Sequence, residues 1–204
     1  MVDPVEFQKL RSPSDLRAFV EQEREKVCAD PEDFRRALLK QGLHKEFLDE
    51  LVSISWFAIL AYPDTVKVMP VLGNQAYDAV VYDELGNEID RIEMTHPHDG
   101  ADSAEDARLL IQRHFGKVHG GVPGQDFEEL TKFVLDTCNK KAKKDYAECS
   151  LVISIEPMKP FSAFVNQYEA QVDSLLGKIS CIHFNAKRVF LLILPDRLEE
   201  VHFA

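Results

Sequence analysis

The sequence predicts an α/β protein: a single domain with a mixed central β-sheet flanked by helices. Helical spacing and capping signals fill residues 1–60, β-branched stretches fill the middle, and strand and helix patterns alternate in the C-terminal third. A chain of 204 residues, 45% hydrophobic, is long enough for one well-buried core. We expect one domain over 1–204, in which a helical N-terminal elaboration (1–33) precedes a central core (34–155), and a C-terminal helix and strands (156–204) complete the sheet.

Two helix starts are marked near the N-terminus. Ser12-Pro13 and Asp30-Pro31 each place a capping side chain before a proline at the first helical position. After the second start, apolar residues at roughly helical spacing predict a helix that continues until Pro63-Asp64 closes it. These residues are Phe34, Leu38, Phe47, Leu51 and Ile54.

The middle of the chain predicts a short strand followed by a β-hairpin. The three expected strands cover residues 66–70, 77–82 and 89–95. Gly86 and Asn87 tolerate the positive φ that a tight hairpin needs. A turn centred between Leu85 and Gly86 places Asp78 opposite Glu93 on one face of the sheet.

The remaining elements follow from the same patterns. Helices are expected over residues 102–115, 126–141 and 160–176, with Gly177 ending the last, and strands over 150–155, 179–184, 188–194 and 201–203. Residues 116–124 contain four glycines and a proline, which predicts a mobile loop. The run of apolar residues in 188–194 is typical of a buried central strand.

We infer a candidate cation site from Asp78 and Glu93. Side chains directly opposed on neighbouring strands have Cβ atoms about 4.5–5.5 Å apart. Two carboxylates at that spacing repel unless a divalent cation, a shared proton or an arginine lies nearby. Mg²⁺ is bound by one or two carboxylates together with waters and phosphates. The alternative is that both face solvent, and a turn shifted by one residue would remove the opposition.

One known family is defined by a hairpin that carries Asp and then Glu-x-Lys. In that family a helix and a strand precede the hairpin, and a helix and a strand follow it. The segments Tyr77–Tyr82 and Ile89–Thr95 resemble it, so the region over about 35–155 is similar to the core of the PD-(D/E)XK nuclease superfamily. The resemblance implies a restriction-endonuclease-like core and a phosphodiester hydrolase using Mg²⁺ or Mn²⁺. It implies that Asp78, Glu93 and the backbone carbonyl of Met94 bind the metal.

The chain departs from this family at one position. Thr95 stands where the family has a lysine, which makes this a degenerate member. We expect Arg91, on the face of Glu93, or a lysine elsewhere to stabilise negative charge, although arginine is a poor base. Lys132 is turned away from the apolar face of its helix. A catalytically inactive nuclease-fold protein that acts as a binding or regulatory module is therefore the alternative.

Four further side chains are candidates for the same site. Many family members use an acid from the first core helix, and Glu46 and Glu50 are the candidates here. His96 and His98 would lie at the mouth of such a site and contact substrate. As a His-x-His pair after a strand, they also resemble part of the metallo-β-lactamase zinc motif, but Gly100 and Ala101 replace its next Asp and His.

The composition limits the kinds of molecule that we expect this protein to bind. A net charge of −11 is unfavourable for unspecific nucleic-acid binding, although a local basic groove and a nucleic-acid partner remain compatible with it. The basic run at 140–144 is either a solvated helix end or a phosphate contact. No membrane association is expected, and scattered cysteines without a signal peptide predict a cytoplasmic protein with reduced thiols. A protein partner or a homo-oligomer stays open.

Overall fold

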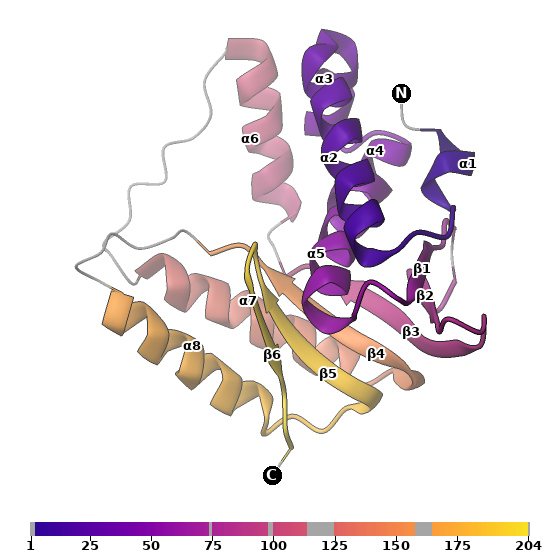
Figure 1. The fold of residues 1–204 in the computed structure, drawn as a ribbon. Coiled ribbons are helices and arrows are strands. Elements are labelled where there is room, and N and C mark those ends of the chain that lie inside the picture. Colours follow the sequence, from indigo (N-terminus) through magenta and orange to yellow (C-terminus); the bar gives the residue numbers. More distant parts are fainter. Residues whose placement is uncertain (1–2, 74, 98–99, 114–124, 158–164, 204) are drawn as a thin grey trace.

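The computed structural model describes residues 3–73, 75–97, 100–113, 125–157 and 165–203. Within them the chain forms a six-stranded mixed sheet with helices around it, which confirms the predicted α/β class (Figure 1). The helices are α1 (Pro4–Phe7), α2 (Pro13–Ala29), α3 (Pro31–Leu38), α4 (Leu43–Glu46), the π-helix η1 (Phe47–Leu51), α5 (Val52–Ala61), α6 (Gly100–Arg113), α7 (Gln125–Lys141) and α8 (Val165–Ile179). The strands are β1 (Lys67–Pro70), β2 (Ala79–Tyr82), β3 (Glu88–Thr95), β4 (Asp145–Ile155), β5 (Asn185–Ile193) and β6 (Arg197–Glu200).

The strands lie in the sheet in the order in which they occur in the sequence. β1, β2 and β3 pair antiparallel, β4 and β5 run parallel to β3, and β6 returns antiparallel at the far edge. Parallel neighbours need a crossover, and helices provide it in both places: α6 and α7 separate β3 from β4, and α8 separates β4 from β5.

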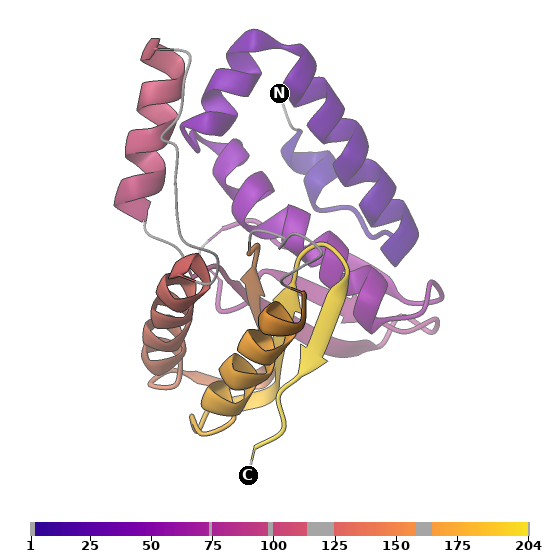
Figure 2. The same ribbon diagram turned by 90° about the vertical axis from the view of Figure 1, so that its left-hand side faces the viewer.

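Two apolar cores lie on opposite faces of the sheet. α2 and α5 pack on one face, where Phe57 and Val152 are fully buried, and α7 and α8 pack on the other, around Leu151 and Val172 (Figures 1 and 2). β4 contributes alternate residues to both cores, which explains its nearly unbroken apolar sequence. α6 extends away from the sheet, alongside the N-terminal helices.

The N-terminal capping signals are confirmed, but the single long helix after Asp30 is wrong. The side chains of Ser12 and Asp30 accept hydrogen bonds from the first turns of α2 and α3. α3 ends at Leu38, because Lys40 and Gly42 adopt positive φ angles of 49° and 57° that a right-handed helix excludes. The chain re-enters helix at α4 and continues through η1 into α5.

Three expectations for the C-terminal third are also wrong. Gly177 does not end a helix but lies inside α8, which continues to Ile179, so no strand forms over 179–184. The last strand is β6 rather than residues 201–203, because the turn after β5 is short and pairing starts at Arg197. The expected loop over 116–124 lies outside the described residues.

The hairpin keeps the predicted register near the site although its turn differs from the prediction. Asp83 N–H donates to the carbonyl of Asn87 (2.9 Å), and a bulge between Val81 and Tyr82 shifts the pairing by one residue. Beyond the bulge, Val80 pairs with Arg91 as expected and Ala79 pairs with Ile92. The bulge therefore compensates for the shifted turn before the strands reach the carboxylates.

Candidate functional site

Asp78 and Glu93 lie on the α7 side of the sheet, at the start of β2 and near the end of β3. Asp78 directly precedes β2, and its N–H donates to the carbonyl of Ile92 (2.7 Å). In β3, Ile92 and Met94 enter the core beneath α5, so Glu93 between them points to the opposite face. The two carboxyl groups thus approach each other from adjacent strands.

The electrostatics of Asp78 show how closely the two groups interact. Burial, and after it the negative charge of Glu93, raise the pKa of Asp78 to about 6. Two contacts oppose this rise: the N–H of Met94 donates to Asp78 Oδ2 (2.7 Å), and the charge of Lys141 is nearby. Asp78 is therefore a half-buried carboxyl group for which an additional positive charge would be favourable.

Lys141 provides a counter-charge to Glu93. Its Nζ lies 2.7 Å from Glu93 Oε1, and the two side chains are only 17% and 13% exposed. The hydroxyl of Tyr146 lies 3.4 Å from the same oxygen, and the Lys141 ammonium is 5.4 Å from the Tyr146 ring centroid. Burial lowers the pKa of Lys141, but its hydrogen bond to Glu93 and the charge of Glu93 outweigh burial, so Lys141 stays a cation.

From the sequence, Lys141 belongs to a basic run that is either a solvated helix end or a phosphate contact, but its position within α7 carried a further signal. Val134 and Cys138 are fully buried on the inner face of α7. Lys141 follows them by seven and three residues, so it continues that face rather than the outer one. Lys132, in contrast, is exposed, as expected. A lysine on the apolar face of a helix was the overlooked feature.

Glu50, from the other layer of the fold, interacts electrostatically with Asp78. Burial raises the pKa of Glu50 to about 7, and the next largest contribution is the charge of Asp78, followed by that of Glu46. Both glutamates belong to the turns where α4 passes into η1, and π-helical turns occur often at functional sites. Glu46 Oε2 is buried without a hydrogen-bond partner among the described residues. Of the two candidates from the first core helix, Glu50 is the one that we place beside Asp78, because the charge of Asp78 contributes to raising its pKa.

Two other predicted residues have different surroundings. The Nε of Arg91 lies 2.7 Å from Glu88 Oε1, and its guanidinium lies 5.1 Å from the Tyr77 ring centroid. Thr95 is 8% exposed and uncharged, next to the site in β3. Lys141, rather than Arg91, is the cation whose ion pair with Glu93 the structure shows.

Met94 and the two histidines have more limited roles in the geometry. Met94 contributes its backbone N–H to Asp78, and its side chain is buried in the core. His96 is half-buried, and His98 lies outside the described residues. Among the described residues, no group of three or more His, Cys, Asp and Glu side chains is arranged to hold a metal ion.

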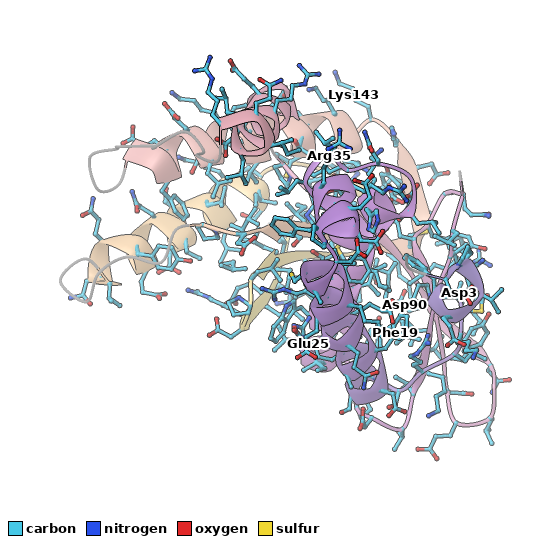
Figure 3. The ribbon with its side chains drawn as sticks, turned by 90° about the horizontal axis from the view of Figure 1, so that it is seen from above. Asp3, Phe19, Glu25, Arg35, Asp90 and Lys143 are labelled. Carbon is cyan, nitrogen blue, oxygen red and sulfur yellow. The ribbon has the colours of Figure 1, made fainter. Side chains whose placement is uncertain are left out.

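Asp90 shows what a purely structural carboxylate looks like in this fold. Strand alternation places it on the opposite face of β3 from Glu93, and it is buried. Figure 3 labels Asp90. Its Oδ2 accepts hydrogen bonds from Tyr62 and Ser150, both 2.7 Å long, and its Oδ1 lies 3.3 Å from Lys187 Nζ. Oδ1 also accepts a hydrogen bond from the N–H of Arg91 (2.9 Å), so each oxygen has two partners. Asp90 therefore links Tyr62, directly after α5, to β4 and β5.

Comparisons with known proteins returned no relatives. No family model, no curated protein and no solved structure matches this chain. Within the described ranges, no helix is both long and apolar enough to cross a membrane.

Proposed function

We propose that this chain is a metal-dependent nuclease or related phosphodiesterase of the PD-(D/E)XK-like type. Asp78 and Glu93 would hold Mg²⁺ or Mn²⁺, and waters and a substrate phosphate would complete the coordination. The observation that carries the proposal is geometric: the N–H of Asp78 donates to the carbonyl of Ile92 (2.7 Å) and the N–H of Met94 donates to Asp78 Oδ2 (2.7 Å), so Asp78 lies beside Glu93. Burial, together with the charge of Glu93, raises the pKa of Asp78 accordingly. Such a pair of carboxyl groups gains from a divalent cation.

The order of the elements supports the same proposal. An antiparallel β1–β2–β3 meander follows α5. Two helices, α6 and α7, then lead to β4, which lies parallel beside β3. This is the order of helices and strands on which the family resemblance rests. The resemblance assigns metal binding to Asp78, which directly precedes β2, and to Glu93 in β3.

Lys141 supplies the charged side chain that position 95 lacks. Its ammonium reaches the Glu93 carboxylate from α7, at 2.7 Å. It is therefore placed to contact a phosphate bound at Glu93 and to stabilise charge there. A divalent cation bound at the same place lowers the pKa of a water molecule and neutralises phosphate charge.

The first test is thermal stability with and without millimolar Mn²⁺. A ligand at ten times its Kd stabilises the native state by about 1.4 kcal/mol, which for a chain of this size corresponds to a rise in Tm of about 3–6 °C. We expect this rise for the wild type and for Glu84→Gln, an exposed control in the hairpin. Asp78→Asn should lose it, and a wild type without any rise would contradict metal binding.

Turnover requires a second measurement. With Mn²⁺ present, the wild type should nick supercoiled plasmid, and Asp78→Asn should reduce the rate at least about a hundredfold, as expected when a site loses one of its two charged ligands. Glu84→Gln should nick at the wild-type rate. Equal rates for all three proteins would show that a contaminant cleaves the plasmid.

A binding or regulatory module is the second candidate. Lys141 already neutralises Glu93, and Thr95 has no charge, so the fold can balance this carboxylate without any catalytic role for it. A Mn²⁺-dependent rise in Tm without plasmid nicking would favour this function over hydrolysis.

A further inference from the structure

We infer that Lys141 is a built-in competitor of the divalent cation, so that the protein weakens its own metal site through α7. The inference rests on the proposed function, because it concerns the same carboxylates. It concerns metal affinity rather than turnover, and it can be measured without a substrate.

The contact between Lys141 and Glu93 is a largely buried ion pair rather than a chance contact at the surface. Both side chains are largely buried, at 17% and 13% exposure, in contrast to the neighbouring Lys140, which is 72% exposed and paired with Asp136 at 2.5 Å. Tyr146 contacts both members, through its hydroxyl and its ring. An ion pair at this depth is screened much less by salt than a surface pair.

Two cations cannot use the same oxygen without cost. The ammonium occupies Glu93 Oε1, so a metal ion at Glu93 either displaces it or binds the other oxygen with a positive charge close by. Lys141 also acts on Asp78, whose pKa its charge lowers. Both proposed ligands therefore already receive positive charge from the same side chain.

Removing that charge should strengthen metal binding. Coupling between two sites on a protein is typically about 5–150-fold in affinity. We expect Lys141→Met to bind Mn²⁺ at least about fivefold more tightly than the wild type, while Lys141→Arg stays close to wild type. Methionine keeps much of the length and the apolar stem of lysine, and melting in the presence of a chelator shows whether the variant is folded.

The measurement is a calorimetric titration of each protein with Mn²⁺ alone. Lys140→Met is the matched control, because it changes the net charge equally on the same helix without touching Glu93. Tighter binding by Lys141→Met only, or binding by that variant and not by the wild type, supports the inference. Equal or weaker binding by Lys141→Met overturns it while leaving the proposed function intact. If no protein binds Mn²⁺, the proposed function fails and the inference fails with it.

Discussion

The half-buried carboxyl groups give this protein a distinctive pH dependence. Burial and like charge raise the pKa of Asp78 from 3.8 to about 6 and that of Glu50 from 4.5 to about 7. A carboxyl group with a raised folded-state pKa binds more protons in the folded chain than in the unfolded chain between the two values. Its contribution to stability therefore falls as the pH rises through that window and stays low above it.

The predicted direction of this pH dependence can be tested at Glu50. A Glu50→Gln variant has no proton to lose, so its free energy of unfolding should decline less than that of the wild type between pH 4.5 and about 7. Above that window the variant should be the more stable protein. Urea unfolding across this pH range is the measurement, with Glu84→Gln as the control. Parallel curves for Glu50→Gln and wild type would contradict a carboxyl group buried beside Asp78.

At the residue scale, the sequence named Asp78, Glu93 and Glu50 as candidates but did not single out Lys141. Alternation along two strands brought Asp78 and Glu93 together, because strand periodicity is local. Lys141 escaped prediction, although its spacing from Cys138 was visible, because a run of lysines at a helix end is usually solvated. Its spacing from Cys138 placed Lys141 on the buried face of α7, but that Glu93 lies opposite this face depends on the docking of α7 against the sheet.

At the element scale, the site depends on how the N-terminal helices are interrupted. Gly42 has φ 57° and ψ −141°, a region essentially restricted to glycine, and it starts the turn into α4 and η1 that carries Glu50. A Cβ at this position would meet nothing within 4 Å, so only the backbone conformation resists a larger residue.

Gly42→Ala should therefore lower the free energy of unfolding by about 1–3 kcal/mol. Gly177→Ala is the matched comparison: this glycine lies within α8, a Cβ there would also meet nothing within 4 Å, and alanine should add about 0.5–1 kcal/mol of stability. Denaturant midpoints measure both changes. A loss at Gly177 or no loss at Gly42 would show that the two glycines have been assigned the wrong backbone roles.

These two glycines also explain why the ends of the helices were harder to predict than the presence of the helices. A glycine ends a helix only when it adopts a left-handed conformation, which its sequence neighbours do not determine. Gly42 interrupts a helical stretch that apolar spacing predicted to continue, and Gly177 continues one that it was expected to end. The capping signals at Ser12 and Asp30 were reliable because they use side chains within three residues of the helix start.

At the scale of the whole molecule, the predicted mixed sheet flanked by helices is confirmed, and the proposed function rests on one end of that sheet. Three parts of the chain meet there: the hairpin with Asp78 and Glu93, the last turn of α7 with Lys141, and η1 with Glu50. The family resemblance suggested that a glutamate from the first core helix joins the hairpin, but the contribution of α7 depends on which helix covers which face and was not predicted. Lys143, by contrast, projects away from the fold after α7 (Figure 3).

The central claim is that Asp78 and Glu93 share a divalent cation. Anomalous diffraction at the manganese edge, from crystals grown with millimolar Mn²⁺, tests it most directly. The account predicts a peak between the two carboxylates, about 2.0–2.4 Å from an oxygen of each, with the Lys141 ammonium shifted away from Glu93. A map without a peak there, and with Lys141 still bound to Glu93, would contradict it.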